Sequence, residues 1–420
     1  MQTKSRLPGI ASFALLWSVA LLPMKIQLSL YGIIVFCLLA FITWVNNTRF
    51  RINLGVILIL LFLALFLSAL FSSDGRTATT FLGREIFLLL IPLAFFLYKI
   101  SDQEKHKALR FFVWGCVVSC VINLLVAIWN SLILTESGFV FDPRVLKEPQ
   151  IDFATSIVWG GNYFFSADLS SFMHPSYFSM YLIFACCIVL VFGNRFHISG
   201  TIRACVVVFL LVMVYLLSSR AAFFSVFLLS LFLWVKRVST WTRFKRVIVL
   251  GTIIVVSFAG FIFNPKLKDL FLKFRTEGLT LQSDGRYSYE TRLLTWYSAC
   301  QIISRHVAFG VGVGDLQNEL QEIYLKNKFV VPYEEKYNVH NQFLETFAGG
   351  GIVTFLILVL VFLTPLYLVR YDHLVSCFLL LTSFNFLFET MLVRYHGVTF
   401  FSLFYCLLLG GVNGNRKDEN

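Results

Sequence analysis

The chain has 420 residues, of which 58% are hydrophobic and only 14% are charged. Soluble globular domains carry roughly 25% charged residues, so this composition excludes a soluble enzyme and indicates an integral membrane protein. The formal net charge of +12 follows the membrane topology derived below, and it does not predict nucleic-acid binding.

Twelve apolar runs approach the ~20 residues that an α-helix needs to cross a bilayer. The first run has no small-residue cleavage site at its end, so we expect a retained span. We therefore predict a single polytopic domain, 1–420, that is all-α with about 12 transmembrane helices. The expected spans are 9–24, 27–45, 53–71, 84–99, 109–134, 176–193, 203–219, 221–235, 247–263, 348–369, 373–391 and 396–412.

The basic residues predict which side each loop faces. With both termini in the cytoplasm, the inner segments hold 18 of the 35 Lys and Arg residues but only five of the 23 Asp and Glu residues. Short cytoplasmic loops are rich in Lys and Arg, and the opposite orientation would reverse this bias. The sequence therefore predicts that segments 135–175 and 264–347 lie on the outer face.

The segment 264–347 is the only long polar stretch, and a loop of this length is typically a functional element. Within it, apolar residues from Tyr289 to Ile303 recur at helical spacing. A second helix is predicted from Leu316 to Tyr324, with Asp315 as its N-cap. We expect a partly helical outer loop that presents polar side chains beside the membrane.

Several cationic or titratable side chains map to the outer side, and arginine is the side chain best matched to bidentate phosphate contacts. An arginine at the end of a span also serves as an anchor in the interface, and a lone histidine also serves a structural role. Both alternatives stay open at this point. The set is Arg84, His174, Arg220, Arg292, His340 and Arg394.

Other classes of site lack their sequence signatures. The glycine run 310–314 has neither the strand–loop–helix context nor the lysine of a phosphate loop, so a flexible turn is favoured. The outer loops contain no histidine or cysteine pair at metal-ligand spacing, so we expect no metal site. The expected spans carry no mid-span Asp or Glu, which argues against an ion-coupled transporter.

Four motifs occur in a fixed order on the predicted outer face: Ser218–Ala222, Glu290–Arg292, Phe309–Gly314 and His340–Glu345. In this order, before a glycine-rich span, they resemble the bacterial O-antigen ligase family. That superfamily also contains O-antigen polymerases and some protein O-oligosaccharyltransferases. One departure is Ala221, where the family often has glycine.

The resemblance implies glycosyl transfer without a metal or other cofactor at the periplasmic face of the bacterial inner membrane. The donor would be a glycan on undecaprenyl diphosphate, and the acceptor a sugar hydroxyl of lipid A–core. Arg220 and Arg292 would hold the diphosphate, and His340 would act on the acceptor hydroxyl. Glu345, about one turn beyond His340, is expected to orient the imidazole. Glu345, Arg84, His174 and Arg394 are also expected to assist substrate binding.

Two alternatives stay open at this stage. An O-antigen polymerase would use the same chemistry with a second lipid-linked glycan as its acceptor. A glycolipid or polyprenyl transporter would move the headgroup without any reaction.

Overall fold

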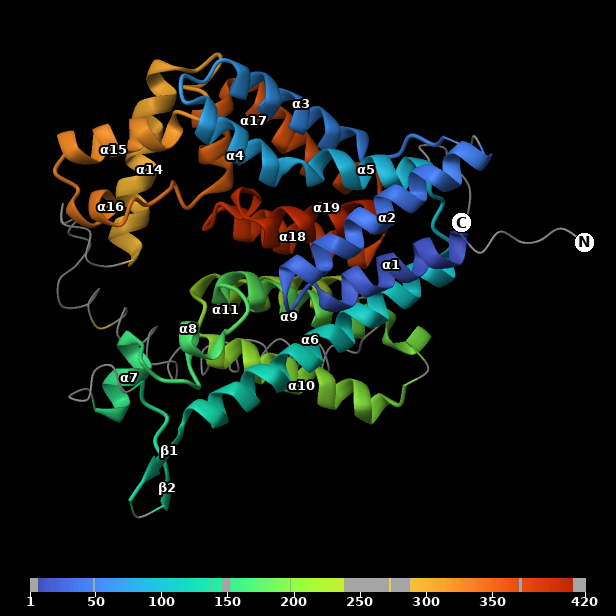
Figure 1. The fold of residues 1–420 in the computed structure, drawn as a ribbon, viewed down its shortest axis with the longest axis vertical. Coiled ribbons are helices and arrows are strands. Elements are labelled where there is room, and N and C mark those ends of the chain that lie inside the picture. Colours follow the sequence, from blue (N-terminus) through green and yellow to red (C-terminus); the bar gives the residue numbers. More distant parts are fainter. Residues whose placement is uncertain are drawn as a thin grey trace, which may run out of the picture. The chain divides into compact units, whose positions relative to one another are not determined.

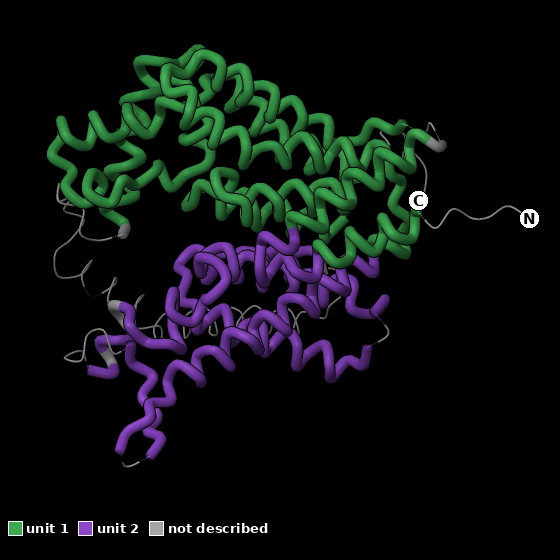
Figure 2. Tube along the Cα trace, viewed as in Figure 1, with its two compact units in different colours: residues 1–18, 30–105, 280–420 green, residues 19–29, 106–279 purple. Residues whose placement is uncertain are grey.

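The computed structural model describes residues 7–47, 50–136, 138–145, 152–196, 198–237, 272, 288–369 and 372–410 (Figure 1). Two compact units divide the chain, as Figure 2 shows. Unit 1 comprises 1–18, 30–105 and 280–420, and unit 2 comprises 19–29 and 106–279. Each unit is described by itself below.

Unit 1 contains most of α1 and α2, the next three helices of the chain, and every described element after residue 280. Its elements are α1 (Leu7–Leu21), α2 (Ile26–Asn47), α3 (Val56–Leu70), α4 (Gly75–Glu85), α5 (Phe87–Leu97), α14 (Ser288–Arg305), α15 (Leu316–Lys326), α16 (Val330–Glu334), α17 (Gln342–Leu368), α18 (His373–Phe386), the short helix η3 (Met391–Val393) and α19 (Tyr395–Leu409).

Unit 2 contains most of α6, a two-stranded hairpin and the helices up to residue 237. Strands β1 and β2 are antiparallel and pair Leu132 with Phe141. The elements are α6 (Asp102–Asn130), β1 (Leu132–Thr135), β2 (Gly138–Phe141), α7 (Phe153–Trp159), α8 (Ser166–Leu169), α9 (Pro175–Phe192), η1 (Gly193–Phe196), α10 (Gly200–Leu217) and α11 (Arg220–Arg237).

The predicted helical membrane character is confirmed for the described chain. Six segments are long and apolar enough to cross a membrane, and four further apolar helices are shorter. The total of about twelve spans stays a prediction, and the expected span 247–263 lies outside the described residues. The six long segments are Ile26–Val45, Gly75–Leu97, Asp102–Asn130, Pro175–Phe196, Gly200–Leu217 and Gln342–Leu368.

Phenylalanine side chains form the packed interior where α17, α18 and α19 meet. Phe362 of α17 lies with its ring centroid 5.4 Å from Phe386 of α18 and 5.6 Å from Phe401 of α19. Phe378 stacks on Phe401 at 5.7 Å. Aromatic pairs at these distances add stability beyond their buried area. This packing sets how the N-terminal ends of α17 and α19 lie next to the end of α18.

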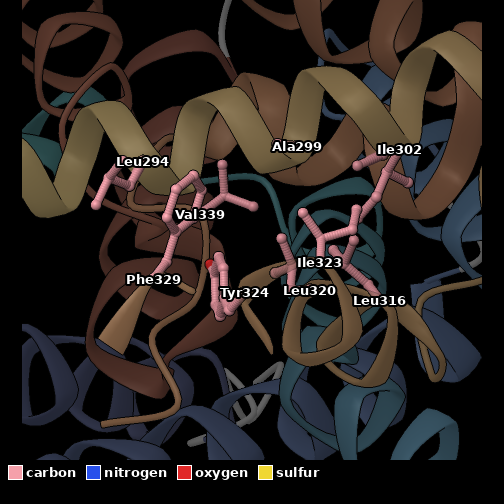
Figure 3. Packing of buried hydrophobic residues seen from close by; sticks show 10 residues of the cluster. Leu294, Ala299, Ile302, Leu316, Leu320, Ile323, Tyr324, Phe329 and Val339 are labelled. Carbon is pink, nitrogen blue, oxygen red and sulfur yellow. The ribbon is translucent and has the colours of Figure 1, made fainter. Parts of the chain in front are cut away.

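The outer segment 264–347 is described only from residue 288 onward, apart from residue 272. Both helices predicted within it are present, as α14 and α15. The apolar residues at helical spacing do not all face the core of α14, because Cys300 and Leu293 are exposed while Leu294 and Ala299 are buried. Figure 3 shows the buried face of α14 packed on α15 residues such as Tyr324.

The buried face of α14 also includes small polar side chains whose hydroxyls are hydrogen-bonded. Thr295 and Ser298 are fully buried because their hydroxyls donate to carbonyl oxygens, Thr295 to Val339 at 3.0 Å and Ser298 to Leu294 at 2.9 Å. A hydroxyl that is satisfied in this way can enter a core. A count of apolar residues alone therefore leaves these two positions out of the buried face.

Asp315 precedes α15 as predicted, but its side chain does not cap that helix. Its carboxylate accepts hydrogen bonds from the backbone N–H groups of Ser73 (2.6 Å) and Asp74 (2.8 Å). These two donors lie just before α4, more than 240 positions away in the sequence. The residue therefore fastens the outer loop to the start of α4.

Candidate functional site: a histidine, glutamate and arginine cluster in unit 1

His340 lies in a constrained turn immediately before α17. Its φ is 52°, in the left-handed region that non-glycine residues rarely adopt. Its backbone N–H donates to Oδ1 of Asn338 at 3.1 Å. Asn341 then caps α17, with its side-chain oxygen accepting from the N–H groups of Phe343 and Leu344. Backbone strain of this kind clusters at functional sites.

One carboxylate joins the imidazole to an arginine. Glu389, between α18 and η3, has its Oε2 3.3 Å from Nδ1 of His340. Its Oε1 accepts from Nη2 of Arg292 at 3.0 Å, and Nε of Arg292 donates to the carbonyl of Phe388 at 3.3 Å. We call His340, Glu389 and Arg292 the HER cluster. It unites α14, the turn before α17, and the segment after α18.

The cluster is accessible without being fully solvated. The side chains of Arg292 and His340 are 24% and 22% exposed, and that of Glu389 is 12% exposed. Partial burial strengthens these charge–charge contacts relative to water. The exposed parts leave the imidazole and guanidinium within reach of a substrate.

The geometry fixes the tautomer that the neutral imidazole must adopt. An ionised carboxylate only accepts hydrogen bonds, so the contact with Glu389 requires the proton of His340 to be on Nδ1. Nε2 then carries the lone pair and can accept a proton. The Tyr337 ring lies edge-on, with its centroid 5.3 Å from that of the His340 ring, and limits how the imidazole rotates.

The expectation that Glu345 orients the imidazole is corrected in part. The carboxylate beside the His340 ring belongs to Glu389, and Oε2 of Glu345 accepts from the backbone N–H of Val339 at 3.1 Å. The carbonyl of Val339 accepts from Thr295. Glu345 therefore holds the backbone of the turn that carries His340, because both polar groups of Val339 are anchored.

The structure places Arg84 and Arg394 at the end of unit 1 that also carries the HER cluster. Nη1 of Arg84, in the last turn of α4, donates to the carbonyl of Val393 at 3.1 Å. Arg394 follows directly and occupies the N-cap position of α19. The backbone N–H of Leu392, two residues before Arg394, donates to Oε1 of Gln342 in α17. These contacts connect both arginines to the segment that carries Glu389.

His174 and Arg220 belong to unit 2. His174 is the N-cap of α9, and its Nδ1 accepts from the N–H of Ser176 at 3.4 Å. Arg220 is the first residue of α11, directly after Ser218 in the left-handed conformation and Ser219. The structure therefore brings Arg84, Arg292, His340, Glu345 and Arg394 into one unit and the other two residues into the second.

The glycine run 310–314 is a packed connection, and its predicted flexibility is wrong. All five of its backbone N–H groups donate within the protein: to the carbonyls of His306, Ala348 and Gly349 and to the hydroxyls of Ser68 and Ser72. A phosphate loop needs such N–H groups aimed at its ligand. The run therefore does not cradle a phosphate.

Sequence reasoning missed the role of Glu389. Its position at the outer end of a predicted span was visible, but its partners His340 and Arg292 are 49 and 97 positions away. One signal could have identified Glu389. Acidic residues are rare in and beside membrane spans, and an ionisable group there is by default a candidate functional residue.

Together these features define a multi-pass membrane protein with a histidine–carboxylate–arginine cluster at the ends of its apolar helices. Residues 205–359, just over a third of the chain, match the family model described as O-Antigen ligase. The match supports a membrane enzyme of the ligase and polymerase superfamily. None of the curated proteins compared with it matches.

The matched region includes Arg220, Arg292, His340 and Glu345. It ends before Glu389, so the carboxylate of the HER cluster comes from outside the matched segment.

Proposed function

We propose that the chain transfers a glycan from undecaprenyl diphosphate to a sugar hydroxyl of lipid A–core at the periplasmic face of the inner membrane. The observation that carries this proposal is the HER cluster. In it, the base His340 and the cation Arg292 each contact one oxygen of the Glu389 carboxylate. Transfer from a lipid diphosphate needs both kinds of group.

His340 acts as the general base in this proposal. The acceptor hydroxyl gives its proton to Nε2 while its oxygen bonds to the anomeric carbon of the donor sugar. The bond between that carbon and the diphosphate oxygen breaks, and the electron pair leaves with the lipid diphosphate. Glu389 stabilises the imidazolium that forms, as carboxylates do beside catalytic histidines.

Arg292 supplies positive charge for the departing diphosphate. A guanidinium held in place before the reaction stabilises developing negative charge without reorganisation, and the contacts to Glu389 and Phe388 hold Arg292 in this way. The family resemblance assigns the same task to Arg220 of unit 2. Arg84, His174 and Arg394 are proposed to assist in binding the substrates.

The donor brings its own activated bond, so the reaction needs no nucleotide. We propose that it needs no metal either, since arginine takes the electrostatic role. Purified protein in detergent, mixed with lipid-linked glycan and lipid A–core, is expected to form the joined product in the presence of a chelator. Loss of transfer on chelation would contradict a metal-independent reaction.

The acceptor separates a ligase from a polymerase. Deletion of the gene followed by a lipopolysaccharide gel is expected to remove every glycan-capped species while lipid A–core persists. Retention of a band with a single repeat would instead identify a polymerase, whose acceptor is a second lipid-linked glycan.

A further inference from the structure

A cavity of about 330 Å³ lies at one end of unit 1, remote from the HER cluster. Its walls come from the segment that precedes α3, the C-terminal end of α5, the turn that leads into α6 and the C-terminal end of α19. Arg394 lies at the opposite, N-terminal end of α19. The 15 residues of this helix span about 22 Å. The cavity is therefore separate from the proposed reaction site.

Three cationic side chains line this basic end cavity: Arg51, Lys99 and Lys105. Asp102 is the one carboxylate side chain among the described lining residues. Nζ of Lys105 donates to the carbonyl of Leu408 at 3.1 Å, which holds the ammonium at the wall. The lining thus has a positive balance and suits an anionic group.

The position of Arg51 is fixed by backbone contacts. Its N–H donates to the carbonyl of Phe96 at 3.1 Å, and the Phe50 ring packs edge-on against the Phe96 ring at 5.6 Å. These contacts attach the segment before α3 to the end of α5. The guanidinium is consequently presented from an ordered backbone, so binding an anion would not require the segment to be ordered first.

The same cavity has an apolar side that a free anion would not use. Phe95 and Phe96 are buried in its wall, while Ile52 is 64% exposed and the adjacent Phe50 is 51% exposed. Cations beside exposed apolar side chains at the ends of membrane helices match a molecule with a charged head and an acyl chain. Basic pockets between transmembrane helices at the cytoplasmic side bind anionic lipid headgroups in this way.

We propose that the basic end cavity binds the phosphate-bearing headgroup of an anionic phospholipid. The predicted orientation places this end of unit 1 at the cytoplasmic leaflet, where Lys and Arg gather. Arg51 and Lys99 bind the phosphate, Lys105 adds charge from the wall, and Ile52 and Phe50 contact the acyl chain. A bound lipid would fasten the ends of α5 and α19 together from the side opposite the reaction.

The test measures lipid binding by the purified full-length protein in a non-ionic detergent, with fluorescent phosphatidylglycerol as the probe and fluorescent phosphatidylcholine as the neutral comparison. The variant Arg51→Gln/Lys99→Gln removes two exposed cations and leaves Lys105 in place. Loss of each basic residue is expected to weaken phosphatidylglycerol binding about fivefold, roughly 30-fold for both.

The matched control is Lys107→Gln/Arg110→Gln, which removes two exposed cations from α6 outside the cavity lining. It is expected to bind phosphatidylglycerol as the wild type does. Equal weakening in both double variants would overturn the proposal, because the effect would then reflect net charge alone. Unchanged binding in Arg51→Gln/Lys99→Gln would overturn it as well. Thermal unfolding checks that both variants are folded.

Competition by soluble anions distinguishes a lipid headgroup from free phosphate as the occupant of the cavity. Inorganic phosphate and diphosphate at millimolar concentration are expected to displace little phosphatidylglycerol, because they lack the acyl chain. Displacement at concentrations comparable with the lipid, or equal affinity for phosphatidylcholine, would overturn the lipid as occupant.

Discussion

At the scale of single residues, the site depends on how Glu389 is shared between a base and a cation. Its two oxygens lie 3.3 Å from the His340 imidazole and 3.0 Å from the Arg292 guanidinium. A carboxylate that contacts both couples the orientation of the imidazole to that of the guanidinium. The three side chains are therefore expected to behave as a unit, with effects that are not additive when they are changed together.

Replacement of His340 tests the base directly. His340→Ala is expected to lower the rate of transfer by about 10²- to 10⁴-fold, the usual contribution of general base catalysis, while donor binding persists because Arg292 remains. His340→Gln can form hydrogen bonds but cannot carry the proton, so it should be nearly as inactive. His306→Ala, at an exposed histidine of the same loop, is the control. Substantial turnover by the Gln variant would limit His340 to positioning the acceptor.

Glu389→Gln tests the sharing of the carboxylate. The amide keeps the shape but cannot stabilise an imidazolium, so we expect kcat to fall about 10²-fold. Donor affinity should not weaken, since Arg292 loses its counter-charge and gains attraction for the diphosphate. Steady-state kinetics with varied donor separate these effects, and Glu334→Gln, at an exposed glutamate of α16, serves as control. Weaker donor binding with an intact kcat would instead assign Glu389 to the donor site.

Arg292→Ala is expected to weaken donor binding roughly 10- to 100-fold, the effect of losing hydrogen bonds to a charged group. Arg292→Lys should restore only part of it, because an ammonium lacks the planar fork that matches phosphate. Arg305→Ala, at an exposed arginine in the last turn of α14, is the matched control. Equilibrium binding of the lipid-linked donor checks this, and wild-type affinity in Arg292→Ala would remove Arg292 from the donor site.

At the scale of elements, the glycine run 310–314 fastens the outer loop to the membrane helices. The N–H groups of Val311 and Gly312 donate to the carbonyls of Ala348 and Gly349 in α17, both at 2.9 Å. This approach is possible because α17 is interrupted at Gly351, where φ is 75° and ψ is −174°. The break leaves carbonyl groups of α17 available to a second backbone, and it lies about two and a half turns after the start of α17.

Gly351→Ala is expected to destabilise the protein by about 2 kcal/mol or more, the combined cost of a positive φ and overpacking. A Cβ at Gly351 would meet the carbonyl oxygen of Ala308, which backbone movement alone can relieve. Gly83→Ala is the matched control, because its Cβ would lie in open space at an exposed position of α4. Thermal unfolding in detergent measures both, and equal unfolding temperatures would show that the contact at Gly351 is adaptable.

The sequence could predict which segments are helices better than it could predict their buried faces and distant contacts. Long apolar runs predict α2, α6, α9, α10 and α17 because membrane burial requires length and hydrophobicity together. The face of α14 and the target of the Asp315 carboxylate could not be predicted, since each depends on a partner far away in the chain. For the same reason His340 was found as a candidate, but its left-handed backbone and its contact with Glu389 were not.

At the scale of the whole molecule, the charge distribution is the property that assigns chemistry to one side of the membrane. Lys and Arg gather in the segments predicted to face the cytoplasm, including Arg51, Lys99 and Lys105 of the basic end cavity. The HER cluster lies at the opposite ends of α5 and α19 in unit 1. The two ends would therefore meet different leaflets, one rich in anionic headgroups and the other facing the periplasm.

This orientation predicts the labelling of single cysteines. Lys326→Cys in a cysteine-free background, at an exposed residue in the last turn of α15, should react with a membrane-impermeant thiol reagent when only the outer membrane is permeabilised. Lys107→Cys, exposed on α6, should react only after lysis, because the charge bias places it in the cytoplasm. The reverse pattern would put the HER cluster on the cytoplasmic side, where the proposed acceptor is not displayed. It would also move the basic end cavity to the outer leaflet, so the one experiment tests the assumption that both proposed sites share.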